Sequence, residues 1–392
     1  MKLPLGYRFA AGFAGLRKTE ADDVGLIVSD PVAQAAAVFT QNIVQAAPVQ
    51  VARRNLRISR NRVAAVLVNA GNANCATRNG IEVVRGSCKA VAKALRTKPE
   101  FVLPASTGVI GVELEEKLLT RIVPKLAENL SAEKFEQVAK AILTTDTKTK
   151  IASEEISLRG GPVRIAGLTK GSGMIHPNMA TTLGFILTDA EIGSRDLTKY
   201  LREGIETSYN ALTVDGDMST NDVVALLANG VARVRPQGRE REVLQAAVQR
   251  ILDSLAEQIA ADGEGARKLI VVRALGFRTV QEARRVGRAI ANSPLVKTAI
   301  AGSDPNWGRI LAAAGYSGVE FDPRKTDIYL QNVLVCQGGL AAPMDESQMK
   351  TLLDQAEVEI RVVVRGRGQA QARFFTCDLT EGYIRINGSY RT

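Results

Sequence analysis

Hydrophobic positions along the chain alternate between short apolar runs and longer amphipathic stretches. Residues 62–69 (RVAAVLVN) form a nearly continuous apolar run, which is typical of a buried strand, whereas residues 81–97 carry apolar side chains at helical spacing. Both patterns recur to the end of the chain. They predict strands at 62–69, 101–106, 183–190, 269–276 and 327–335, and helices at 81–97, 112–129, 131–143, 195–212, 241–262, 281–293 and 345–357.

Glycine, proline and alternating segments add hairpins to this pattern. Residues 156–161 and 162–170 meet at Gly160-Gly161-Pro162, which predicts a hairpin. Because strands, helices and hairpins are mixed, the sequence favours a layered α/β or α+β fold over a doubly wound sheet. No repeat or low-complexity linker divides the chain. Near the C-terminus, further strands are predicted at 357–366, 372–380 and 382–388.

Length and composition narrow the functional classes. The 392 residues are 45% hydrophobic, which suffices for a large core, and no run of about 18 apolar residues predicts a membrane-spanning helix. The N-terminus is interrupted by Pro4 and Arg8 and lacks the apolar region of a signal peptide. Four cysteines with no CxxC pair predict neither a disulfide framework nor a zinc site. We therefore expect a cytoplasmic protein.

The charge of the chain is unevenly distributed. Residues 1–180 hold 25 basic and 15 acidic side chains, whereas the remainder holds 26 of each. A basic half attracts nucleic acid or small acidic substrates, but aromatic residues are only 5% and do not interleave with basic runs as base stacking requires. We expect no nucleic-acid binding. A basic, non-enzymatic binding protein is kept as an alternative, which an uncut chain that retards nucleic acid would favour.

The chain has a single histidine, His176. It cannot build a multi-histidine metal site, and any Ser-His-Asp arrangement would have to use this one residue. Asp215, Asp217 and Asp262 could mimic a calcium loop, but the segment DGDMSTND lacks the glycine and terminal glutamate of an EF-hand at the right offsets. We therefore expect no bound metal, and a catalytic base of a less usual kind.

The densest group of candidate residues is the segment KGSGMIHPNMATT, residues 170–182. Its glycines and proline fit an ordinary loop, and it lacks the residue order of a phosphate-binding loop. A threonine hydroxyl needs a nearby base, and a threonine at a chain terminus supplies one with its own α-amino group, whose pKa is about 7.7–8.0. Attack of the Thr181 hydroxyl on the Ala180 carbonyl would produce that terminus by an N-to-O acyl shift followed by hydrolysis.

This segment resembles the autoprocessing site of the ornithine acetyltransferases, the glutamate N-acetyltransferases of arginine biosynthesis. The resemblance extends over nearly the whole chain, and the matching blocks follow one another in the same order as in the family. One departure is Arg78-Asn79, where family members commonly have a glycine. The further blocks that carry it are NAGNANCATRNG (69–80), PASTGVIG (104–111), ILTTDT (142–147), VDGDMSTND (214–222), ADGEGARKLI (261–270), NSPLVKTAIAGSDPNWGRI (292–310) and CDLTEGYIRINGSYRT (377–392).

The resemblance implies an activity and a set of site residues. The acetyl group of N2-acetyl-L-ornithine would pass to L-glutamate by ping-pong chemistry on Thr181, without a redox or metal cofactor. Thr107 and Gly108 match the oxyanion hole of the family, on a loop expected after the strand 101–106. Whether acetyl-CoA also serves as acetyl donor is left open. The positions that match substrate-binding residues are Thr144, Lys170, Thr181, Glu264, Asn387 and Thr392.

The resemblance also implies a fold and an assembly. The fold would be a layered α/β/β/α sandwich, made of a chain 1–180 and a chain 181–392 that form one intertwined catalytic unit. Two precursors would give a heterotetramer. We further expect the final strand to fold back over the Thr181 pocket. A threonine-nucleophile aminopeptidase or amidase of related fold, with water as acceptor, is the alternative within the same chemistry.

Overall fold

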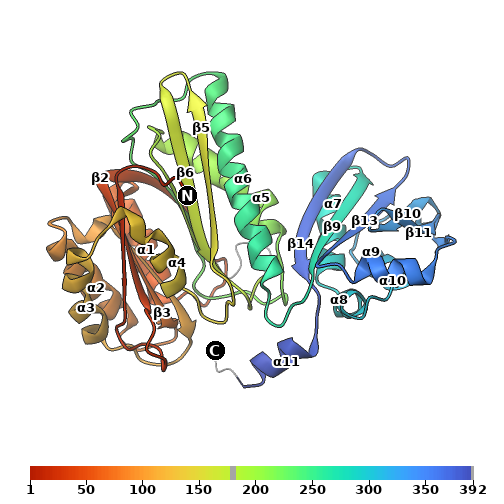
Figure 1. Ribbon diagram of the computed structural model, residues 1–392, viewed down its shortest axis with the longest axis horizontal. Helices are drawn as coiled ribbons and strands as arrows, with labels where there is room; N and C mark the ends of the chain where they lie inside the picture. Colours follow the sequence, from red (N-terminus) through yellow and green to blue (C-terminus); the bar gives the residue numbers. More distant parts are fainter. Residues whose placement is uncertain (177–181, 390–392) are drawn as a thin grey trace.

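The computed structural model describes residues 1–176 and 182–389, which form two lobes (Figure 1). The larger lobe is built on an eight-stranded sheet in the order β4-β3-β2-β8-β7-β6-β5, with β1 paired to β2. Its strands are β1 (Tyr7–Gly12), β2 (Val24–Phe39), β3 (Arg62–Asn72), β4 (Val102–Val109), β5 (Lys150–Leu158), β6 (Gly161–Lys170), β7 (Leu183–Thr188) and β8 (Val223–Ala228). Its helices are α1 (Ala47–Ser59), α2 (Gly80–Ala94), α3 (Glu116–Glu128), α4 (Phe135–Ala141), α5 (Ser194–Thr207) and α6 (Arg239–Ala261).

The large sheet folds over itself into two facing layers. In β7, Phe185 and Leu187 join the core between the layers, whereas Ile186 joins the core under α5 and α6. In β3, Val66 joins the same inner core, whereas Leu67 packs with α2 and α3. The order from one side to the other is therefore helices, sheet, sheet and helices (Figure 1). This confirms the layered α/β fold that the sequence pattern favours and the α/β/β/α sandwich that the family resemblance implies.

Strand β2 joins the two halves of the sheet. Its residues 24–28 and 33–34 pair with β3, and its residues 34–39 pair with β8. Strands β7 and β8 follow the segment 177–181 in the sequence, yet they lie between β2 and β6, which precede it. Strands from before and after the segment 177–181 are therefore hydrogen-bonded to one another within a single sheet.

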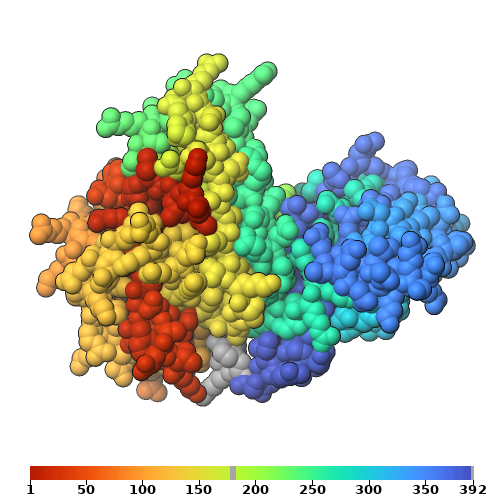
Figure 2. All heavy atoms as spheres, in the orientation of Figure 1, coloured from red at the N-terminus to blue at the C-terminus, as the bar shows by residue number. Residues whose placement is uncertain are grey.

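The smaller lobe holds a six-stranded sheet in the order β12-β11-β10-β13-β9-β14. Helix α7 packs on one face of β9 and β14. Helix α6 of the larger lobe contacts the opposite face of the same two strands. Figure 2 shows the two lobes side by side. The elements are β9 (Leu269–Phe277), α7 (Val280–Ala291), α8 (Pro294–Ala301), α9 (Trp307–Gly315), β10 (Thr326–Leu330), β11 (Val333–Gln337), β12 (Leu340–Ala341), α10 (Glu346–Leu353), β13 (Glu357–Val364), β14 (Ala370–Cys377) and α11 (Glu381–Asn387).

The strand predicted at 382–388 is wrong, because this segment is helix α11, which lies below the smaller lobe and beside the lower end of the larger lobe (Figure 1). Thr380 caps its start: the hydroxyl oxygen accepts the Gly382 N–H at 3.0 Å and donates to the Gly265 carbonyl at 2.6 Å. The alternation of YIRIN suggested a strand, but a capped turn anchored to the larger lobe sets the local conformation.

Two other sequence predictions need correction. The strand predicted at 327–335 is a hairpin of β10 and β11, because Gln331 and Asn332 adopt positive φ angles of 48° and 65° and reverse the chain. Helix 112–129 starts later, at Glu116, and continues through Pro124 without ending. No described helix is long and apolar enough to cross a membrane.

Candidate active site

A cavity of about 330 Å³ lies where the ends of the large sheet meet helix α11. Ala180, Thr181 and Thr392 of the predicted site lie outside the described residues. The remaining predicted residues come from β4, the loop after α4, the end of β6, the turn after α6, and α11. All of them line this one cavity: Thr107, Gly108, Thr144, Lys170, Glu264 and Asn387.

Thr107 and Gly108 lie within strand β4 and not on a loop, which corrects the expectation from the sequence. Pairing with β3 continues past Ser106, through an irregularity in register at Asn72. Gly108 has φ +127°, and a Cβ there would lie 2.3 Å from the carbonyl carbon of Gly71. Only glycine fits this approach of the two strands, and bulged strand ends are a common way to aim groups into active sites.

The Thr107 hydroxyl on β4 is contacted by Lys170 from the end of β6, a strand that is not paired with β4. Its oxygen accepts a hydrogen bond from Lys170 Nζ at 3.3 Å. Because the oxygen is used as an acceptor, the hydroxyl proton can be donated into the cavity, as stabilisation of an oxyanion requires.

The start of β7 is fixed at Thr182, the residue after Thr181. The Thr182 N–H donates to Asp222 Oδ1 at 2.8 Å, and its hydroxyl donates to the Lys170 carbonyl at 2.8 Å. The Thr169 hydroxyl lies 2.9 Å from the Thr182 hydroxyl. Burial raises the pKa of Asp222 well above its ordinary value, although the Thr182 N–H and the Lys170 charge act in the opposite direction.

Sequence reasoning did not single out Asp222 as a site residue. Its signal was present, since it ends the VDGDMSTND block and directly precedes the apolar strand β8. The next residue back, Asn221, donates to the Ala73 carbonyl at 2.7 Å and to the Ser106 carbonyl at 2.9 Å. This loop therefore ties the ends of β3, β4 and β7 together.

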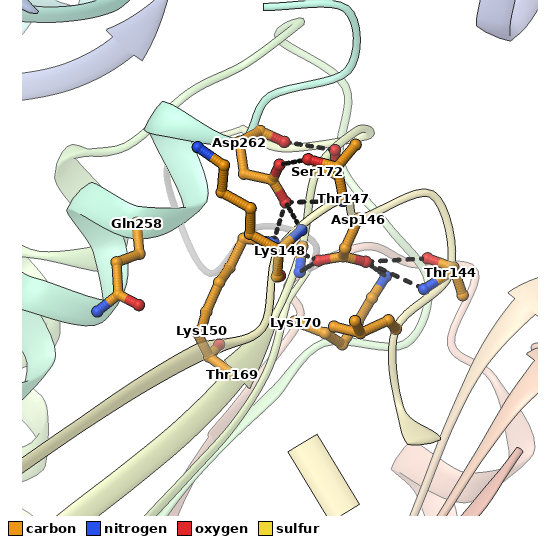
Figure 3. A network of polar contacts seen from close by, with 12 residues as sticks. Thr144, Asp146, Thr147, Lys148, Lys150, Thr169, Lys170, Ser172, Gln258 and Asp262 are labelled. Carbon is orange, nitrogen blue, oxygen red and sulfur yellow. Dashed lines mark hydrogen bonds and ion pairs between the residues drawn. The ribbon is translucent and has the colours of Figure 1, made fainter. Parts of the chain in front are cut away.

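Beneath the cavity, the Asp146 carboxylate contacts residues of its own loop and residues at the end of β6 (Figure 3). Its Oδ2 accepts the Thr144 N–H at 3.0 Å and lies 3.8 Å from Lys170 Nζ. Its Oδ1 accepts from Lys150 Nζ and from the Gly171 N–H, both at 2.7 Å. The carboxylate thus holds the loop after α4 against the end of β6.

Asp262 is the second carboxylate of this network (Figure 3). Its Oδ2 accepts from Lys150 Nζ at 2.5 Å and from the backbone N–H groups of Thr147 and Lys148 at 3.0 and 3.2 Å. Its backbone carbonyl accepts the Ser172 hydroxyl at 2.6 Å. Asp262 therefore closes the turn that carries Glu264, and its carboxylate is occupied by donors of the protein itself.

The pKa values in this network follow from burial and from charge. Burial alone would raise the pKa of Asp146, but Lys170 and Lys150 together hold it well below its ordinary value. Burial lowers the pKa of Lys170, with Lys150 acting in the same direction, while Asp146, Glu264 and Asp222 act against this.

Glu264 and Asn387 form the opposite wall. Asn387 Nδ2 donates to Glu264 Oε2 at 2.7 Å. A Cβ at Gly173 would lie 2.3 Å from the Glu264 carboxylate, so the absence of a side chain at Gly173 leaves room for that carboxylate. Glu264 is buried, and a buried carboxylate facing a cavity is suited to an ammonium ligand.

Asp215 shapes the loop before the segment 177–181. Its carboxylate accepts the N–H groups of Met174 at 2.6 Å and of Ile175 at 2.9 Å, and the Tyr383 hydroxyl donates to it at 3.4 Å. Burial raises the pKa of this carboxyl, although those backbone donors lower it. Over the described residues, no group of three or more His, Cys, Asp or Glu side chains is arranged to hold a metal ion.

Comparison with known proteins points to one family. The ArgJ family model matches residues 8–392. The chain is 45% identical over 393 residues to the arginine biosynthesis bifunctional protein ArgJ of Thermus thermophilus, covering 100% of both chains. It is 42% identical over 400 residues to the protein of the same name from Caldanaerobacter subterraneus subsp. tengcongensis, covering 100% of this chain and 98% of that relative.

Solved structures include one similar protein of the same name. The crystal structure of the arginine biosynthesis bifunctional protein ArgJ from Bacillus halodurans superposes with a TM-score of 0.51 at 39% sequence identity. The superposition covers 53% of this chain and 98% of that chain. The mixed α/β architecture is therefore shared.

Proposed function

Because this chain belongs to the ArgJ family, we propose that it is an acetyltransferase of arginine biosynthesis that moves the acetyl group of N2-acetyl-L-ornithine to L-glutamate. The observation that carries the proposal is the convergence of six residues from five separate segments on one cavity of about 330 Å³. A cavity of this size, with few charged groups of both signs, suits an amino-acid substrate.

Thr181 is the proposed nucleophile, freed as a chain terminus by cleavage after Ala180. Its hydroxyl oxygen attacks the acetyl carbonyl carbon, and its α-amino group accepts the hydroxyl proton. The C–N bond then breaks and the proton passes to the departing ornithine amine, which leaves an acetyl ester on Thr181. The amine of glutamate attacks that ester, giving N-acetyl-L-glutamate and restoring the hydroxyl. Support comes from Thr182, which three hydrogen bonds fix at the start of β7.

The oxyanion and the substrate have separate proposed partners. The Thr107 hydroxyl and the Gly108 N–H would stabilise the tetrahedral oxyanion, Lys170 would hold the substrate carboxylate, and Glu264 would hold an ammonium group. Thr144 and Asn387 would complete the substrate contacts, with Thr392 at the end of the chain. All of these steps use groups of the protein and need no metal or redox cofactor.

The remaining parts of the proposal concern the donor and the assembly. We include acetyl-CoA as a second acetyl donor, since the relatives are named bifunctional. The chains 1–180 and 181–392 would stay associated, because β7 and β8 of the second lie between β2 and β6 of the first. Two such pairs would form a heterotetramer in the cytoplasm.

The test is acetyl transfer from N2-acetyl-L-ornithine to L-glutamate, measured as N-acetylglutamate formed. We expect transfer by the wild-type protein and none by Thr181→Ala, which should also remain a single chain. Acetate release without any requirement for glutamate would instead indicate an amidase. The same assay with acetyl-CoA as donor decides whether the enzyme has one activity or two.

A further inference from the structure

Four charged groups are buried together beneath the cavity. The side chains of Asp146, Lys150, Lys170 and Asp262 are between 0% and 5% exposed. Lys170 lines the cavity, whereas Lys150 lies behind it and reaches only carboxylates and a backbone carbonyl (Figure 3). Burying an ionised group away from water destabilises the fold unless an opposite charge lies nearby. The charge state of each of these four groups therefore depends on the others.

We propose that Asp146 and Lys150 are opposing positioning residues for Lys170: Asp146 keeps its ammonium group charged and turned toward Thr107, and Lys150 limits how tightly Asp146 holds it. This rests on the proposed function, in which Lys170 binds the substrate carboxylate. Neither Asp146 nor Lys150 touches the substrate in this account.

The distances support a division of the Asp146 charge between two lysines. Lys150 Nζ is 2.7 Å from Oδ1, whereas Lys170 Nζ is 3.8 Å from Oδ2 and 3.3 Å from the Thr107 hydroxyl. The long contact to Asp146 leaves the Lys170 ammonium able to donate into the cavity. If Asp146 were closer to Lys170, its carboxylate would compete with the substrate carboxylate for the Lys170 ammonium group.

The surroundings of Lys170 predict opposite consequences when the two residues are changed. The charged groups that act on it are Asp146, Lys150, Glu264 and Asp222, while Asp262 balances Lys150. In Asp146→Asn, a buried lysine loses its nearest anion and keeps a cation nearby, so it releases its proton at lower pH. In Lys150→Met, the competing cation is gone, so Lys170 keeps its proton to higher pH.

The experiment is L-glutamate binding measured by calorimetry between about pH 6.5 and pH 9.5 for the wild type and for each variant, so that titration of the ligand affects all the curves equally. Binding should fall as pH rises through the pKa of Lys170. We expect this fall to move to lower pH in Asp146→Asn and to higher pH in Lys150→Met, by about one pH unit or more in each case. Lys148→Met is the matched control, because Lys148 is an exposed lysine of the same segment, and its fall should match the wild type.

A purely structural role predicts a different result. Both variants would then unfold at lower temperature, with the pH dependence of binding unchanged, and that outcome would overturn the proposal. If Asp146→Asn does not fold, the upward displacement in Lys150→Met, or in Lys150→Gln, decides alone. Failure of the wild type to transfer acetyl groups would count against the proposed function, whereas wild-type transfer with coincident binding curves would count against this inference only.

Discussion

Lys170 lies on one wall of the cavity, the strand wall, at the buried end of β6, and the Thr182 hydroxyl donates to its backbone carbonyl from the start of β7. Asn387 lies on the opposite wall, the helix wall, on helix α11, which has no buried residue. The strand wall is fixed by main-chain pairing and by the carboxylates of Asp146 and Asp222. The helix wall depends on a few side-chain contacts, such as Asn387 with Glu264. The difference suggests that the strand wall carries the chemistry and anchors the substrate carboxylate through Lys170, whereas the helix wall only adds contacts that retain the substrate.

The largest expected effect comes from the strand wall, with Thr107→Ala. Loss of one oxyanion donor typically costs about 2.7–4 kcal/mol of barrier, so we expect kcat to fall by about 10²–10³ with little change in KM. Steady-state kinetics of acetyl transfer measure this, and Thr107→Ser, which keeps the hydroxyl, should retain most of the rate. A raised KM with unchanged kcat would place Thr107 among the binding groups instead.

A smaller effect is expected at Asp222, which holds the start of β7. In Asp222→Ala the buried Thr182 N–H loses its acceptor, which should lower the free energy of unfolding by about 1–3 kcal/mol. We expect a lower melting temperature and a larger fraction of uncut chain on a denaturing gel. Asp222→Asn keeps an oxygen acceptor and should be closer to the wild type. Equal behaviour of the alanine and asparagine variants would show that this hydrogen bond does not fix the strand.

The smallest effect is expected on the helix wall, with Asn387→Ala. Its hydrogen bond to the Glu264 carboxylate is partly exposed, so its loss should weaken substrate binding by about 1.5 kcal/mol, which corresponds to a rise in KM of about tenfold. The value of kcat and the extent of self-cleavage should stay close to the wild type. Ile384→Ser is the control on the same helix, since Ile384 is 73% exposed, and it should change neither constant. A large loss of kcat in Asn387→Ala would contradict the division between the walls.

The sequence predicted the strand wall better than the helix wall, for physical reasons. Continuous apolar runs such as 62–69 and the long amphipathic stretch 241–262 have strong periodicity, and both elements are present as β3 and α6. The segment 382–388 is short, and its alternation fits a strand as well as a helix. Its conformation depends on Thr380 and on Gly265, a residue more than a hundred positions away in the chain.

The site residues were accessible to sequence reasoning where they lie in recognisable blocks. Lys170, Glu264 and Asn387 belong to such blocks, and the structure brings them to one cavity. The charge network behind them was not accessible in this way. Lys150 appears in the sequence as an ordinary lysine, and its partner Asp262 is 112 positions away, so only the folded chain reveals that both are buried together.

The nucleophile that we propose for this site, Thr181, is made by cleavage of the chain after Ala180. N-terminal sequencing and intact mass of purified, active protein test it most directly. We expect two chains that separate under denaturing conditions, one starting at Met1 and the other at Thr181, and a single inactive chain in Thr181→Ala. Full acetyl-transfer activity in a single chain that begins only at Met1 would contradict it.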